Sequence, residues 1–147
     1  MSDAISRLKE LSARLNNSSD TLTEAVKSAE AKLASLRLGV SAWLEEPIDI
    51  EQEFNEKGEL EDQYITRFGY TKCNGAWHLA LMENSERWGD IEESGWPKIT
   101  PLQQAPRELR VKALQKLPAL LGTLTAKAIA ALQEVDKALD VARTWLD

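Results

Sequence analysis

The chain of 147 residues contains one cysteine and one histidine, and this scarcity excludes several kinds of site. A single cysteine cannot form an internal disulfide, which fits a reducing compartment. One Cys and one His are too few for a structural zinc site, which takes four such ligands. We therefore expect neither a metal nor another cofactor.

Long apolar runs are also missing. No segment approaches the roughly 20 apolar residues that span a bilayer, and the opening MSDAISRLKELSARL lacks the apolar centre of a signal peptide. The motifs of phosphate-binding loops, dinucleotide-binding folds, serine hydrolases and zinc proteases do not occur either. We expect a cytoplasmic protein that is not an enzyme and does not bind membranes.

Acidic residues outnumber basic ones, and one segment accounts for the whole imbalance in the net charge of −6. Residues 45–62 (EEPIDIEQEFNEKGELED) hold nine acidic residues and one lysine, which leaves 24 − 9 = 15 acidic and 18 − 1 = 17 basic residues elsewhere. A nearly neutral chain with an acidic segment does not attract nucleic-acid phosphates. The short basic cluster Arg107, Arg110, Lys112 and Lys116 is interpreted as a solvated helix face, and no nucleic-acid partner is expected.

Two segments, 1–38 and 107–147, have the periodicity of long amphipathic helices. The polar stretch NNSSD (16–20) does not shift the phase of the first, which favours one continuous helix over the alternative of two. Pro118 predicts a kink or a new first turn in the second. The seven-residue rows are Leu8, Leu15, Leu22, Ala29 and Leu36 in the first, and Leu121, Ala128, Val135 and Ala142 beside Leu117, Leu124, Ala131, Ala138 and Trp145 in the second. Leu132, Leu139 and Leu146 add a third row to the second helix.

Residues 40–83, with the acidic insertion 45–62, predict an antiparallel β-meander of three or more short strands. The Asn-Gly dipeptide at 74–75 predicts a two-residue hairpin turn, because both positions of a type I′ turn need positive φ. The register that this turn sets pairs Cys73 with Ala76, Thr71 with His78, Tyr70 with Leu79, and Phe68 with Leu81.

The segment 84–106, with two tryptophans and three prolines, predicts a long loop. The whole chain then predicts a single α+β domain: a long N-terminal helix, the meander and a long C-terminal helix, with the two helices packed as an antiparallel hairpin. Trp88 and Trp96 of the loop and Trp77 of the hairpin are candidates to line a ligand pocket.

Cys73 and His78 are the one combination that suggests nucleophilic catalysis. A catalytic cysteine needs a base within hydrogen-bond reach and a group that stabilises negative charge. The hairpin places the two residues diagonally, and no Gly-rich loop or helix start follows the cysteine. We interpret both as structural and assign no catalytic residue.

The acidic segment is the candidate interaction site. Ile48, Ile50 and Phe54 alternate with carboxylates, which predicts a half-buried edge whose charged outer side steers a basic partner. The alternative is a solvated insertion. The candidate partner-binding residues are Asp49, Glu51, Glu53, Phe54, Glu59 and Glu61.

These features lead to three functional hypotheses. The first is a non-enzymatic cytosolic interaction protein that self-associates through its helices and presents an acidic surface to a basic partner. The second is an inhibitor or immunity-type factor that masks a basic toxin or nuclease site. The third is a small-ligand binder or enzyme that uses the pocket of Trp77, Trp88 and Trp96.

Overall fold

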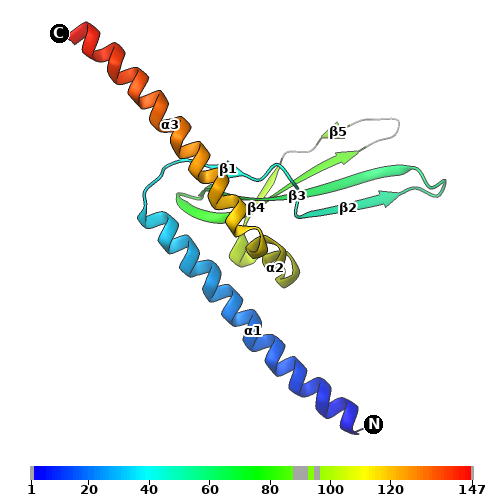
Figure 1. Cartoon of the computed structure of the whole chain (residues 1–147). Helices are drawn as coiled ribbons and strands as arrows, with labels where there is room; N and C mark the ends of the chain where they lie inside the picture. Colours follow the sequence, from blue (N-terminus) through cyan, green and yellow to red (C-terminus); the bar gives the residue numbers. More distant parts are fainter. Residues whose placement is uncertain (1, 88–92, 95–96, 147) are drawn as a thin grey trace.

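The computed structural model describes residues 2–87, 93–94 and 97–146, and confirms the predicted α+β class and order of elements (Figure 1). A long helix comes first, an antiparallel sheet follows, and helices end the chain. The elements are α1 Ser2–Ser35, β1 Ala42–Trp43, β2 Asp49–Phe54, β3 Leu60–Cys73, β4 Ala76–Arg87, β5 Glu93–Ser94, β6 Lys98–Pro101, the 3₁₀ helix η1 Leu102–Gln104, α2 Arg107–Gln115 and α3 Leu117–Leu146.

Helix α1 runs without a break through residues 16–20, so the prediction of one continuous helix is confirmed. Its end lies slightly earlier than predicted. Arg37 and Gly39 both take positive φ, at 51° and 66°, which ends the helical turn and redirects the chain toward β1. The N–H groups of Leu36 and Arg37 bond to carbonyls of the last turn.

The segment 107–147, predicted to be helical with a kink or a new first turn at Pro118, consists of the two helices α2 and α3. Lys116 lies between α2 and α3 in a non-helical conformation. Pro118 falls in the first turn of α3, where its missing N–H costs no hydrogen bond. The predicted alternative of a new first turn at this proline is therefore the one that the chain adopts.

The hairpin of β3 and β4 has the predicted register in all four pairs. Asn74 and Gly75 take φ of 51° and 85°, as a type I′ turn requires. Strands β1 and β2 pair with β3, and β5 and β6 pair with β4, so the sheet has six antiparallel strands. The two central strands have 14 and 12 residues and are not short.

The prediction of a loop over 84–106 is wrong for the part of this segment that the structure describes; residues 88–92 and 95–96 lie outside it. Strand β4 continues to Arg87, and β6 pairs with its middle, setting Pro101 opposite Ala80 and Lys98 opposite Glu83. A charged residue and a proline at its two ends suit an edge strand, because one side of the strand needs no ladder hydrogen bonds. The composition of residues 98–101, which favours a loop, therefore also fits the short edge strand β6.

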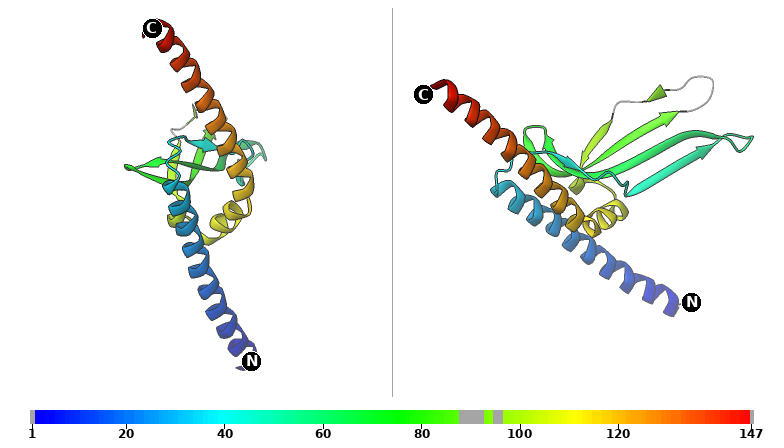
Figure 2. Two further views of the ribbon diagram at one scale, coloured as in Figure 1. Left: turned by 60° about the vertical axis from the view of Figure 1, so that its left-hand side comes forward. Right: turned by 45° about the horizontal axis from the view of Figure 1, so that its top comes forward.

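The predicted antiparallel packing of the two long helices is wrong as well. All three ribbon views show α1 and α3 running in the same direction (Figures 1 and 2). The reason lies in the return path: β6, η1 and α2 bring the chain back beside the middle of α1, where Arg110 bonds to Ser19, and α3 starts from there. The N-terminal half of α1 and the C-terminal half of α3 consequently project at opposite ends of the molecule.

The core lies where the helices cover one end of the sheet. Burying these apolar side chains supplies the main driving force for folding. The sheet contributes Phe68, Tyr70, Leu79 and Leu81, and the helical segments contribute Val26, Leu33, Leu102, Ala113, Leu120 and Leu124. The other end of the sheet extends beyond the helices (Figure 1).

Candidate functional site

Carboxylates from three neighbouring strands lie on one face of this extended end of the sheet. The register sets Glu53 opposite Asp62 and Glu51 opposite Tyr64. Since side chains alternate between faces, these residues share the face that further along carries the buried Phe68. The acidic face, as we name it, consists of Asp49, Glu51, Glu53, Asp62 and Glu83.

The charge of the acidic face affects its neighbours. The carboxylate of Glu53, followed by that of Asp62, raises the pKa of the Tyr64 phenol, because each disfavours a further negative charge. Asp49 forms an ion pair with Lys112 of α2 at 2.9 Å and thereby raises the pKa of that amine. Within the described residues, Glu51 and Glu53 make no ion pair and stay available.

The six candidate partner-binding residues do not form one surface. Asp49, Glu51 and Glu53 lie on the acidic face, whereas a register shift between β2 and β3 separates Phe54 from them. The predicted half-buried edge is wrong on this point: Phe54 is 58% exposed, because β2 ends in the part of the sheet that extends beyond the helices (Figure 1). The other two candidates lie near the tip of the hairpin, where Glu59 donates its N–H to the Asn55 side chain and Glu61 precedes Asp62 on β3.

A pocket of about 370 Å³ lies where the acidic face meets α2. Glu51, Glu83 and Lys98 line it from the sheet, and Gln104 and Leu109 line it from the helical side. Lys98 is paired in register with Glu83, so the pocket has mixed charge. A basic side chain that enters it would meet Glu51 as its free carboxylate.

An apolar groove separates α1 from α3 on the side away from the sheet. Two adjacent pockets, of about 350 and 460 Å³, make up this helix groove. Ala25 and Ala29 face Leu117 and Leu121 in one pocket; further along, the second pocket is lined mainly by leucines of both helices. From the first of these pockets to the second, the residue numbers rise along both α1 and α3, so the two helices run parallel.

Apolar side chains continue from the helix groove onto both projecting helix halves. On α1, Leu8 is 65% exposed, and on α3, Leu132 is 60% exposed and Trp145 84%. These side chains lie in the same seven-residue rows that line the groove. The large exposed hydrophobic residues of the two halves are Ile5, Leu8, Leu11 and Leu15 on α1, and Ile129, Leu132, Val135, Leu139, Val141, Trp145 and Leu146 on α3.

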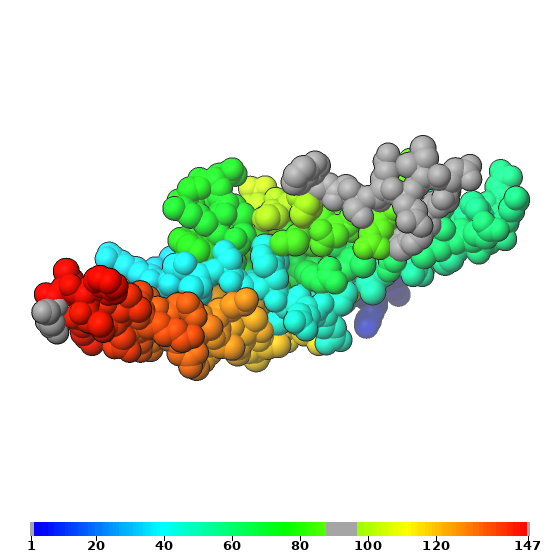
Figure 3. All heavy atoms as spheres, turned by 90° about the horizontal axis from the view of Figure 1, so that it is seen from above, coloured from blue at the N-terminus to red at the C-terminus, as the bar shows by residue number. Residues whose placement is uncertain are grey.

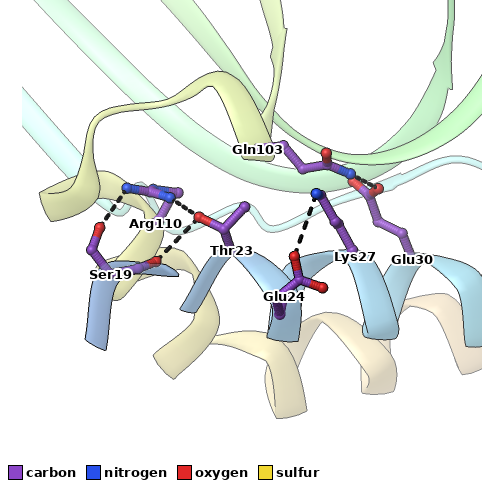
Figure 4. Close-up of polar contacts among 7 residues, drawn as sticks. All are labelled: Ser19, Thr23, Glu24, Lys27, Glu30, Gln103 and Arg110. Atoms are coloured by element: carbon purple, nitrogen blue, oxygen red, sulfur yellow. Dashed lines mark hydrogen bonds and ion pairs between the residues drawn. The ribbon is translucent and has the colours of Figure 1, made fainter. Parts of the chain in front are cut away.

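Glu30 of α1 is buried, with 7% of its surface exposed, and its carboxylate joins three elements. One oxygen accepts the N–H of Leu79 at 3.0 Å, and the other accepts a hydrogen bond from the Gln103 amide at 2.6 Å (Figure 4). His78 Nδ1 lies 3.5 Å from the second oxygen. These bonds satisfy a buried carboxylate, as its placement requires.

The polar stretch in the middle of α1 is where α2 docks. The Arg110 guanidinium donates to the hydroxyl groups of Ser19 and Thr23 (Figure 4). The interpretation of the basic cluster as a solvated helix face is therefore wrong for Arg110, which is half-buried, and for Lys112, which binds Asp49. The sequence signal for this contact is NNSSD itself, a run of poor helix formers inside a long helix.

The Cys73 thiol is not placed for nucleophilic catalysis. Cys73 and His78 are diagonal neighbours across the hairpin, as the register predicts. Burial, assisted by the nearby Glu30 carboxylate, raises the pKa of the Cys73 thiol, which is the opposite of activation. His78 lies against Glu30, so the histidine belongs to a structural contact.

The predicted tryptophan pocket can be described only in part. Trp77 stacks on Tyr70 with ring centroids 5.3 Å apart, a packing contact at the edge of the core. Trp88 and Trp96 lie outside the described residues.

In the described parts of the chain, no group of three or more His, Cys, Asp or Glu residues is arranged to hold a metal ion. None of the described helices has the length and apolarity that crossing a membrane would take.

Comparison of the chain with protein-family models, with curated protein sequences and with solved structures finds no match. Function must therefore be argued from the surfaces described above.

Proposed function

We propose that this protein is a non-enzymatic interaction protein that self-associates through α1 and α3 and presents its acidic face to a basic partner. The observation that carries the proposal is the uncovered apolar surface along both helices. Exposed apolar patches of this extent are typical of protein–protein interfaces, because water contact with so many leucines is unfavourable.

The acidic face supports the second part of the proposal. Glu51 and Glu53 are exposed on the face that carries Tyr64, and the Glu53 carboxylate is the main cause of the raised pKa of that phenol. A field of one sign accelerates the approach of an oppositely charged protein. The pocket next to Glu51 offers a place for a basic side chain of that partner. We also propose a cytoplasmic location, which the single free Cys73 supports.

Sedimentation velocity of a seam variant tests the self-association. In Leu8→Glu/Leu132→Glu, each helix carries one carboxylate within the apolar rows. Since burying each leucine is worth about 1.5–3 kcal/mol, we expect the dissociation constant to rise at least about a hundredfold. Unchanged association of this variant would contradict the proposal.

The matched control is Ala13→Glu/Ala126→Glu, which adds the same two charges to the same helices. Both alanines are exposed and lie outside the apolar rows. The control should associate like the wild type. Circular dichroism of both variants checks that α1 and α3 still form.

A further inference from the structure

The two projecting helix halves lie at opposite ends of the molecule (Figure 2). Residues 2–18 of α1 are all exposed, and so is nearly every residue of α3 from 125 onward. Viewed from above, the C-terminal half of α3 extends past the sheet along one edge of the molecule (Figure 3). Each half therefore leaves a full helix face for a partner.

The two apolar halves and the helix groove form one continuous seam. It runs along α1 from Ile5, passes through the groove at Ala25 and Leu121, and continues along α3 to Leu146. A partner that covers the seam must therefore match two helix halves that point the same way but are displaced along their axes.

We propose that this partner is a second copy of the chain, related by a two-fold axis that crosses the helix groove near Ala25 and Leu121. The proposal rests on the proposed self-association and specifies its geometry. A two-fold axis perpendicular to the helices reverses their direction, so the α1 half of each copy lies antiparallel on the α3 half of the other. Both contacts form at once and the assembly closes, as in most homodimers.

The seven-residue rows fit together in this arrangement. In an antiparallel pair of helices, each contact layer contains one residue from each helix. A residue from the first seven-residue row of one helix packs against a residue from the second row of the other helix. Setting Ala25 against Leu121 of the other copy fixes the layers further out: Leu15 meets Ala131, and Leu8 meets Ala138. These three layers each combine a large and a small side chain, which favours close packing, and the layer of Leu11 and Val135 joins two large ones.

Charges along the two halves are also complementary in this register. Arg14 and Glu134 are displaced by two residues, about 3 Å along the axis, and both lie beside the apolar rows, where flanking ion pairs form in coiled coils. Arg7 comes level with Asp140, and Asp3 with Arg143. These outer pairs are further apart, yet they place opposite charges within about one Debye length of 10 Å.

The amount of surface suits a stable dimer. The two halves expose eleven large hydrophobic side chains beside the apolar lining of the groove, whereas a standard interface buries about 800 Å² per partner. In a head-to-tail assembly, the α1 half of one copy would lie parallel on the α3 half of the next copy. The helix groove would then stay open, and one helix half would stay free at each end of the assembly. The two-fold arrangement covers the groove and both halves.

Disulfide trapping tests the geometry. In a Cys73→Ser background, Leu11→Cys and Val135→Cys are introduced together, because this register sets Leu11 against Val135 of the other copy. Within one chain the two positions are roughly 45 Å apart along the helix axes, so they cannot join. Mild oxidation should convert nearly all of the protein to a covalent species of twice 16.4 kDa.

Controls exclude non-specific oxidation. Leu11→Cys alone and Val135→Cys alone should give no covalent dimer, since the two-fold axis keeps like positions far apart. Leu11→Cys with Ala142→Cys, displaced by one seven-residue repeat or about 10 Å, should trap poorly. Circular dichroism before oxidation confirms that each variant folds.

The remaining outcomes overturn the proposal in distinguishable ways. A ladder of larger covalent species would show a head-to-tail assembly. A wild-type protein that is dimeric by mass, whose cysteine pair does not trap, would refute the antiparallel register and leave the self-association intact. A wild-type protein that stays at 16.4 kDa would refute both.

Discussion

The Glu30 carboxylate accepts the backbone N–H of Leu79 at 3.0 Å and so ties α1 to the edge of the sheet. Strand β6 pairs with β4 only from Ala80 onward, so it does not reach the N–H of Leu79. Glu30 takes the place of a neighbouring strand at this position. Gln103, just after β6, holds the same carboxylate from its other side.

Glu30→Ala should destabilise the fold by about 2–3 kcal/mol, because it leaves a buried N–H and the Gln103 amide without their acceptor. Urea denaturation followed by tryptophan fluorescence measures the change in the free energy of unfolding. The exchange variant Glu30→Gln/Gln103→Glu keeps one acceptor for Leu79 and one donor–acceptor pair with residue 103. It should recover more than half of the loss, whereas a deficit as large as that of Glu30→Ala would show that the contact is incidental.

Gly69→Ala should also destabilise the protein. A Cβ at this position would overlap the Trp43 ring and approach the Ala42 carbonyl oxygen at 2.5 Å. The resulting displacement of β1 should cost about 1–3 kcal/mol. Gly122→Ala is the opposite control: it lies within helix α3 with no atom within 4 Å of the added Cβ. That change should stabilise by about 0.5–1 kcal/mol, and thermal or urea unfolding of both variants tests the contrast.

The Cys73 thiol should react slowly with alkylating reagents. Its pKa is raised by burial and by Glu30, so less thiolate exists near pH 7.5 than for an ordinary cysteine, whose pKa is about 8.5. The labelling rate should keep rising above pH 9, and Cys73→Ser should retain self-association. A rate profile with a midpoint below 8 would mean an activated thiol and would reopen the question of catalysis.

The Tyr64 phenol provides a direct measurement of the acidic field. Because Glu53 is the main cause of its raised pKa, Glu53→Gln should lower that pKa toward the ordinary value. Ultraviolet titration in a Tyr70→Phe background reads Tyr64 alone, since the chain has two tyrosines. Glu61→Gln is the matched control and should shift the pKa less, because the Glu61 carboxylate is not among the causes of the raised pKa.

Reversal of charge tests the use of this field in binding. Glu51→Lys/Glu53→Lys should abolish binding of a lysine-rich peptide that the wild type binds at low salt, because both exposed carboxylates become repulsive. Wild-type binding should weaken steeply as salt rises. Glu59→Lys/Glu61→Lys, at the tip of the hairpin, should have the smaller effect. Equal losses from the two pairs would mean that net charge alone matters.

Local signals in the sequence predict local structure well. The Asn74–Gly75 turn sets the whole register of β3 and β4, because a two-residue loop permits only one pairing. The seven-residue row of α1 correctly indicates a continuous helix through residues 16–20. In both cases neighbouring residues determine the outcome.

Features that depend on distant contacts were not predictable in the same way. The direction of α3 relative to α1 follows from the docking of Arg110 onto Ser19, two residues 91 positions apart. The role of Glu30 likewise depends on where β6 stops. The composition around residues 98–101 fits both a loop and an edge strand, and only pairing with β4 decides between them.

The candidate site shows the same division. Alternation along β2 correctly places Glu51 and Glu53 on one face, but the register shifts between Glu53 and Phe54. It does not tell which face the helices cover, and they cover the side that carries the carboxylates. Nor does it tell where along the strand the helices stop: Phe54 lies beyond them and is exposed (Figure 1), although an apolar residue in an alternating strand normally faces the core.

The mass of the wild-type protein in solution tests the central claim most directly. Multi-angle light scattering after size exclusion, repeated over a hundredfold range of loading concentration, measures it without a probe. We predict a mass of twice 16.4 kDa at the upper concentrations, with any decline only on dilution. A mass of 16.4 kDa at every concentration would contradict self-association through the helices.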